Sequence, residues 1–150
     1  MAKGDFTAKI DPRDYVKIMD TLSGLSEIER EAAIAKAISE GLDVILRQGK
    51  ANLAASNIKT RTGNLKGSFT KLTNKTKLYG YAGFKRPQGA AAHLLDRGTK
   101  KRYTKTGANR GSVTGNYFWT KAVEMKKEEA QRELMDSVEK TIQNIINRNN

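Results

Sequence analysis

The sequence predicts an α+β fold, in which an antiparallel sheet of about four strands packs against a long central helix and a long C-terminal helix. Two long segments carry apolar residues at three- and four-residue steps, the period of an amphipathic helix. Between them, apolar and polar residues alternate, which is the period of a half-buried strand. With 150 residues, the chain is long enough to form one domain with its own core.

Residues 1–57 are predicted to hold a strand and two helices. Apolar and polar residues alternate over 5–10 and predict a short strand. A helix follows, because Asp11 can cap it and Pro12 suits the first helical position. Gly24 ends this first helix.

The central helix is predicted to start at a capping box and to run to about Ser56. Ser26 and Glu29 have the three-residue spacing at which each side chain satisfies the other's backbone N–H. Gly41 and Gly49 lower the helix propensity of this segment. We expect them to mark close packing or a gentle bend.

Residues 58–97 are predicted to form a β-meander. Its strands are expected at 66–73, 76–85 and 90–97, with turns between them that carry Asn, Lys, Pro or Gly. In 76–85 the even-numbered residues are small or apolar and indicate a core face. The odd-numbered residues, Tyr79 among them, indicate an aromatic and cationic face in contact with water.

Residues 98–115 are predicted to be a mobile basic loop, and residues 116–150 the C-terminal helix. The loop holds four glycines and five Lys or Arg residues, with almost no apolar side chain. Loops of this length without secondary structure are uncommon in compact domains unless they have a function or a partner orders them. The apolar stripe of the last helix begins at Trp119.

The positive charge of the protein lies in its middle. Residues 58–110 contain fourteen Lys or Arg and a single acid, Asp96, which gives a net charge of +13. Residues 1–57 carry a net charge of −1, and residues 111–150 are neutral. A sequence pI near 10 indicates a polyanionic partner. Because both long helices are nearly neutral, a sequence-reading recognition helix is not expected.

The cations of the loop are the candidate contacts to DNA in a channel or to an acidic partner. Such cations can touch phosphates without reading bases, which gives binding that is salt-dependent and blind to sequence. A solvated surface loop explains the same composition equally well at this point. The candidates are Lys100, Lys101, Arg102, Lys105 and Arg110.

No catalytic, metal or cofactor site is predicted. The chain has no Cys and a single His, His93, and in a strand this residue and Asp96 would point to opposite faces. A small toxin-like ribonuclease that uses His93, Tyr79 and Tyr81 is the weaker enzymatic alternative. The chain shows no signal peptide and no membrane-spanning apolar run, so we expect it in the cytoplasm of the cell that makes it.

Three short motifs occur in a recognisable order. They are the turn Thr62-Gly63-Asn64-Leu65-Lys66-Gly67-Ser68, the segment Leu95-Asp96-Arg97-Gly98-Thr99 and the helix start Asn116-Tyr117-Phe118-Trp119. Over nearly the full chain, this order resembles the tail-component family of long-tailed bacteriophages, the tail-completion or neck proteins. The turn, strand-end and helix-start motifs of that family map to Thr62, Gly63, Leu65, Asp96, Gly98, Thr99 and Phe118. The family usually has a proline where this chain has Tyr117.

The resemblance implies a structural virion protein of the phage neck with no enzymatic activity. Such proteins form a ring, commonly sixfold, between the connector and the tail tube, and DNA passes through it. A homo-oligomer, hexamer or dodecamer, is therefore expected, with connector and tail-terminator or tail-tube proteins as neighbours. It would be assembled in the cytoplasm of the host bacterium. A sequence-nonspecific nucleic-acid-binding protein is the alternative.

Overall fold

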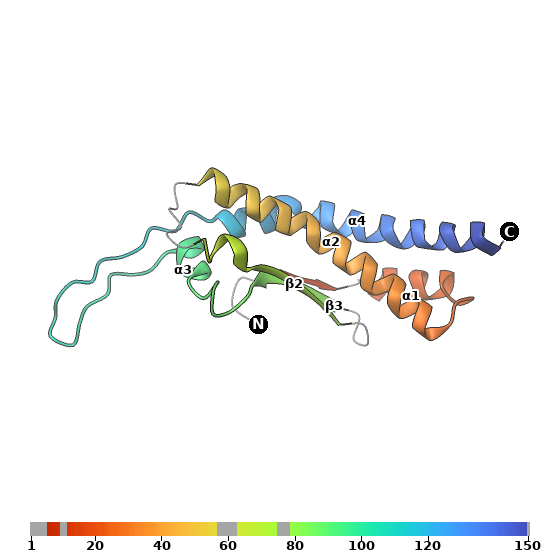
Figure 1. The fold of residues 1–150 in the computed structure, drawn as a ribbon, viewed down its shortest axis with the longest axis horizontal. Coiled ribbons are helices and arrows are strands. Elements are labelled where there is room, and N and C mark those ends of the chain that lie inside the picture. Colours follow the sequence, from red (N-terminus) through yellow and green to blue (C-terminus); the bar gives the residue numbers. More distant parts are fainter. Residues whose placement is uncertain (1–5, 10–11, 57–62, 75–78, 150) are drawn as a thin grey trace.

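The fold combines two long helices with one small sheet (Figure 1). Helix α2 (Glu27–Ala55) and helix α4 (Phe118–Asn149) run in opposite directions and lie on one side of the sheet. The prediction of a mixed fold with a long central helix and a long C-terminal helix is confirmed. The computed structural model describes residues 6–9, 12–56, 63–74 and 79–149.

The sheet has fewer strands than predicted. Strands β2 (Phe69–Asn74) and β3 (Tyr79–Phe84) form an antiparallel pair of six residues each, with Leu72 opposite Tyr81. The four-residue strand β1 (Phe6–Lys9) pairs with the other side of β3. The described residues thus form a three-stranded sheet in the order β1-β3-β2.

The third strand predicted for the meander is wrong. Residues 90–97 contain helix α3 (Ala92–Arg97) instead. The run of alanines and leucines in this segment consists of strong helix formers and lacks the polar–apolar alternation of a strand. Helix α3 ends at Gly98, which adopts φ 81° and donates its N–H to the Leu94 carbonyl at 2.8 Å.

The first meander strand begins later than predicted. Lys66–Ser68 form a short 3₁₀ turn, η1, and β2 starts at Phe69. Leu65 is buried, and its carbonyl accepts the Ser68 hydroxyl at 2.7 Å. Gly63 adopts φ 71°, the left-handed conformation in which a residue without Cβ is least strained. The predicted turn is therefore present, while Thr62 lies outside the described residues.

The helices of the N-terminal part follow the sequence closely. Helix α1 (Pro12–Thr21) precedes the capping box, in which the Ser26 hydroxyl accepts from the Glu29 N–H at 3.3 Å. The Glu29 carboxylate accepts from the Ser26 N–H at 3.1 Å. The predicted cap of α1, Asp11, lies outside the described residues, as do residues 75–78 of the predicted second strand.

An aromatic cluster forms the centre of the core where the sheet meets the start of α4. Phe69 and Phe84 have ring centroids 4.8 Å apart, and Phe84 lies 5.2 Å from Trp119. Phe118 and Trp119 are buried. Large buried aromatic rings in these packed geometries contribute strongly to a small core, so the first turn of α4 is fixed to the sheet.

Two glycines of α2 allow the helices to approach closely. A Cβ atom at Gly41 would lie 2.9 Å from the Ala130 carbonyl oxygen of α4. A Cβ atom at Gly49 would lie 2.8 Å from the Trp119 ring. The expectation that these glycines mark close packing is confirmed.

We predict that Gly49→Ala destabilises the protein by about 1–3 kcal/mol, because overpacking in a filled core has that cost. Helix propensity alone predicts the opposite change, an increase of about 1 kcal/mol in the free energy of unfolding. Urea-induced unfolding measures the difference. The control is Gly24→Ala, since nothing lies within 4 Å of a Cβ at Gly24. A Gly49→Ala protein as stable as the wild type would contradict the packing described here.

Candidate nucleic-acid interface

Residues 98–115, here called the arm, project from one end of the body (Figure 1). The arm leaves the body between α3 and the N-terminus of α4 and returns to the same place. Isolated antiparallel bridges join Gly98 to Thr114 and Tyr103 to Asn109. The predicted loop therefore folds back on itself as a hairpin without regular strands, a pairing that the sequence did not indicate.

Backbone hydrogen bonds connect the two limbs of the arm along its length. The pairing between the two isolated bridges is irregular, because Arg102 bonds to both Arg110 and Gly111 of the other limb, which is a bulge. Whether the arm is mobile in solution stays a prediction. The cross-arm bonds run from Thr99 N to Val113 O at 2.8 Å, Arg102 N to Gly111 O at 3.0 Å, Arg110 N to Arg102 O at 2.6 Å and Thr104 N to Ala108 O at 2.8 Å.

Small polar side chains close the tip of the arm. The Thr104 hydroxyl accepts from the Ala108 N–H at 2.9 Å, and the Gly107 N–H donates to the Thr104 carbonyl at the same distance. Gly107 adopts φ 87°, which favours glycine. The composition that predicted a loop is thus the composition of a tight turn.

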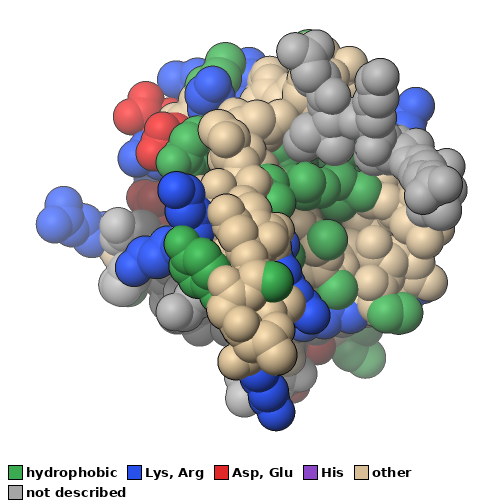
Figure 2. Space-filling view, turned by 90° about the vertical axis from the view of Figure 1, so that its left-hand side faces the viewer, with side chains coloured by type: hydrophobic (Ala, Val, Ile, Leu, Met, Phe, Trp, Pro, Cys, Tyr) green, Lys and Arg blue, Asp and Glu red, His purple; other side chains and the backbone are tan. Residues whose placement is uncertain are grey.

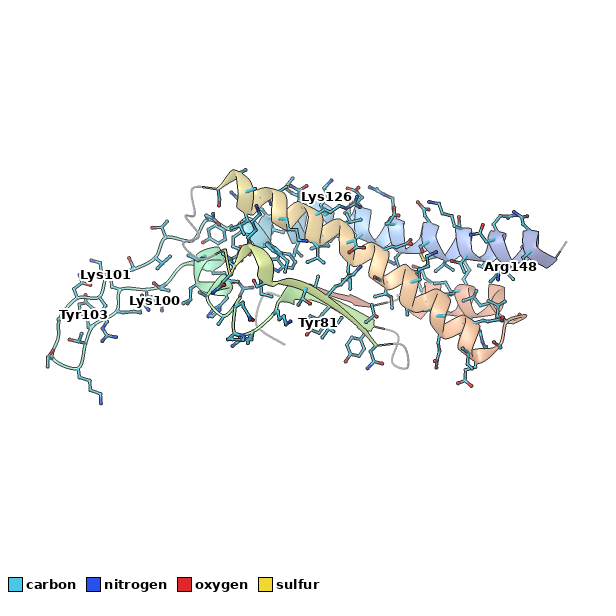
Figure 3. All side chains as sticks on the ribbon, in the orientation of Figure 1. Tyr81, Lys100, Lys101, Tyr103, Lys126 and Arg148 are labelled. Carbon is cyan, nitrogen blue, oxygen red and sulfur yellow. The ribbon has the colours of Figure 1, made fainter. Side chains whose placement is uncertain are left out.

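The five candidate cations are all exposed on the arm, and none forms an ion pair within the described part of the chain. Figure 2, which views the arm end-on, shows Lys and Arg side chains on both of its sides. Figure 3 places Lys100, Lys101 and Tyr103 well away from the body. The arm itself contains no acidic residue, so its positive charge faces solvent unopposed.

Two cations of the body form ion pairs with acidic side chains. Lys71 of β2 contacts Asp43 of α2 at 2.7 Å, and Lys126 contacts Glu129 within α4 at the same distance. The hydrogen bond and the charge of Lys126 hold the pKa of the Glu129 carboxyl below its ordinary value. The arm, with five exposed cations and no acid, is the candidate surface for binding a polyanion.

A buried carboxylate anchors the root of the arm. Asp96, the last acid of α3, is only 3% exposed. Its Oδ1 accepts from the Trp119 N–H at 2.9 Å and from the Thr120 N–H at 3.0 Å, and its Oδ2 accepts from the Thr120 hydroxyl at 2.5 Å. Asp96 thus caps α4 from a distant part of the chain and places negative charge at the positive end of the helix dipole.

Every backbone N–H in the first turn of α4 has an acceptor. The Phe118 N–H donates to Asn116 Oδ1 at 3.0 Å, and the Lys121 N–H donates to the Tyr117 carbonyl at 2.9 Å. Just before the helix, the Tyr117 N–H donates to the Asp96 carbonyl at 2.8 Å. Because the first N–H groups of a helix lack partners within it, this network explains how α4 can start inside the protein.

The two limbs of the arm touch at their base through glycines. A Cβ at Gly98 would lie 2.6 Å from the Gly115 nitrogen, and a Cβ at Gly115 would lie 2.5 Å from the Arg97 carbonyl carbon. The Thr99 hydroxyl accepts from the Val113 N–H at 2.9 Å. Gly98 and Thr99 therefore have a local structural role, which is to close the base of the hairpin.

Tyr117, which stands where the family described above usually has proline, has an unusual backbone conformation. Tyr117 adopts φ 58°, the only non-glycine residue with positive φ in the described chain. Proline is restricted to φ near −65° and could not adopt this conformation. The absence of the proline before Phe118 is consistent with the geometry of this junction.

The candidate ribonuclease residues lie on two different elements, His93 on α3 and the two tyrosines on β3. His93 lies in α3, so the prediction that it and Asp96 occupy one strand is wrong. His93 is exposed, whereas the Asp96 carboxylate is engaged with α4. Tyr79 and Tyr81 lie two residues apart in β3, and Figure 3 shows Tyr81 on the sheet face away from α2.

Neither a metal-ligand cluster nor a membrane-spanning helix occurs in the described part of the chain. No group of three or more acidic or histidine side chains is arranged to hold a metal ion. No described helix is long and apolar enough to span a membrane.

The sequence motifs did not reveal which residues meet. Asp96 and Thr120 are far apart in the chain, and so are Gly98 and Gly115, yet they form one junction. A glycine at each end of an acid-free basic run is the signal that indicates a hairpin closed at its base. The role of Asp96 as a helix cap has no local signal, because a cap is normally sought directly before the helix.

Comparisons with protein-family models, with curated proteins and with solved structures found no match.

We predict that Asp96→Ala lowers the free energy of unfolding by about 2 kcal/mol, the upper end of the cost of losing an N-cap. The reason is that two N–H groups of α4 would lose their acceptor in a buried place. Chemical denaturation measures the change. Asp96→Asn is the matched control, since its side-chain oxygen can still accept both bonds, and it should cost less. Equal stability of Asp96→Ala and wild type would contradict this role.

Proposed function

We propose that this chain is a structural virion protein of the phage neck, a tail-completion or head–tail joining protein. It forms a homo-oligomeric ring, a hexamer or dodecamer, between the connector and the tail tube, and genomic DNA passes through the ring. It has no enzymatic role and requires no cofactor. It is assembled in the host cytoplasm and ends in the neck of the virion.

The observation that carries this proposal is the junction at the root of the arm. Asp96, Gly98, Thr99 and Phe118 come from two motifs of the resemblance, and all four lie where the arm joins the body. A subunit of a ring presents the same surface at every repeat. A basic arm held by a capped helix and a closed hairpin base suits that requirement.

The sheet face that points away from α2 supports the need for neighbours. Leu72 is 55% exposed on this face, directly opposite Tyr81 in the β2–β3 ladder. The two long helices cover the other face (Figure 1). An apolar and aromatic sheet surface of this kind is suited to contact with another subunit or ring.

A sequence-nonspecific nucleic-acid-binding protein that acts as a monomer or dimer is the second candidate. The unpaired cations of the arm favour it, because they suit phosphate contacts without base reading. The two candidates differ in assembly. The neck protein requires a closed ring with its neighbours, whereas the second candidate requires only DNA.

We predict that the gene for this chain lies beside genes for a portal, a capsid and a major tail protein. We also predict that the purified chain forms a closed ring when mixed with the connector or tail-tube proteins encoded there. Native mass spectrometry gives the number of subunits, and electron microscopy shows whether the ring caps a tail or connector. A chain that neither oligomerises nor caps either preparation would contradict the neck proposal.

A further inference from the structure

Two arginines of the arm face each other at a β-bulge. The Arg110 N–H donates to the Arg102 carbonyl at 2.6 Å and the Arg102 N–H donates to the Gly111 carbonyl at 3.0 Å, so Arg110 and Gly111 together face Arg102. The neighbouring pair toward the tip is Tyr103 with Asn109. Residues directly opposite in an antiparallel pair place their side chains on the same face. Arg102 and Arg110 therefore lie side by side, although like charges in such positions destabilise a hairpin.

The remaining cations extend this charge to the other face and to the tip. Lys100 and Lys101 lie on the same limb as Arg102, well away from the body (Figure 3). Lys105 lies in the turn at the tip. Figure 2 shows basic side chains on both sides of the arm. A ligand that contacts all five of these basic side chains must carry negative charge along its length and on more than one side.

The composition of the arm favours nucleic acid over an acidic protein. Protein interfaces are built on buried aromatic and apolar anchors, and lysine is depleted from them. The arm offers Tyr103, Ala108 and Val113 as its only such side chains. In contrast, the major groove of DNA is wide enough for a two-stranded ribbon, and phosphates line both of its edges.

We propose that the arm binds the phosphate backbone of double-stranded DNA without reading its sequence, and that Arg102 and Arg110 act together as a phosphate-binding pair. This inference rests on the proposed function in so far as the DNA that passes through the neck is the ligand. A backbone phosphate bound between the two guanidinium groups carries one negative charge and attracts both of them, so the repulsion that is unfavourable in the free arm is offset in the complex.

The wild-type chain is tested first with short fluorescent DNA duplexes of two unrelated sequences. Fluorescence anisotropy is expected to give equal affinity for both. If all five cations contact phosphates, the slope of log K against log salt is about −4 to −5. Poly-glutamate of matched charge serves as the probe for an acidic protein surface. Binding to poly-glutamate as tight as binding to DNA, or no binding to either, would overturn the proposal.

Arg102→Glu separates loss of a phosphate contact from loss of structure. The new carboxylate faces Arg110, and opposite charges across a hairpin stabilise it, so exchange of the arm amides should slow. DNA affinity should nevertheless fall on the order of tenfold or more, and the salt slope should shrink in magnitude by about 1 or more. Unchanged DNA affinity in this variant would overturn the role of Arg102.

Two control variants complete the experiment. Lys127→Glu makes the same change of charge at an exposed position of α4, and it should bind DNA far more tightly than Arg102→Glu. Arg102→Lys keeps the charge and should retain most of the affinity. If Lys127→Glu loses as much affinity as Arg102→Glu, binding depends on net charge alone and the pair has no special role.

These measurements use the isolated chain and do not depend on ring formation. A chain that forms rings but fails to bind DNA would refute the inference and leave the neck proposal intact. A chain that binds DNA through Arg102 but never forms a ring would refute the neck proposal and leave this inference standing.

Discussion

The capping of α4 by the Asp96 carboxylate is the interaction on which the position of the arm depends. A single buried side chain accepts the N–H groups of Trp119 and Thr120, and the backbone carbonyl of the same residue accepts the N–H of Tyr117. The two ends of the arm are thereby tied to each other and to α4. Because α4 begins in the aromatic core, the direction in which the arm leaves the body is set by the core itself.

Close packing at glycine makes this arrangement compact. Gly49 allows the Trp119 ring to lie against α2, and Gly98 and Gly115 allow the limbs of the arm to meet. The basic side chains of the body and of the arm differ in their ion pairs. Lys71 and Lys126 of the body have acidic partners, whereas the cations of the arm form no ion pair with the residues that the structure describes. The arm thus gathers five cations without an acid on a hairpin that projects from the packed body.

Much of the helical part of the fold could be predicted from the sequence, because the signals are local. The capping box at Ser26 and the apolar period of α2 and α4 depend on residues close together in the chain. The prediction of a strand at 90–97 is wrong because the alanines and leucines of this segment favour helix. The hairpin and the cap at Asp96 could not be predicted, since both depend on contacts between distant residues. The sequence composition identifies the five cations of the arm. It does not show which of them face each other, because that depends on how the two limbs pair.

The central claim is that the arm is a formed hairpin in the free protein, held at its root by Asp96. Amide hydrogen exchange measured by NMR on the isolated wild-type chain tests it most directly. The amides of Thr99, Arg102, Thr104 and Arg110 each donate across the arm, and they should exchange more slowly than in an unstructured peptide. The amides of Trp119 and Thr120 should be protected as well. Exchange of the arm amides at the rates of an unstructured chain would contradict the account.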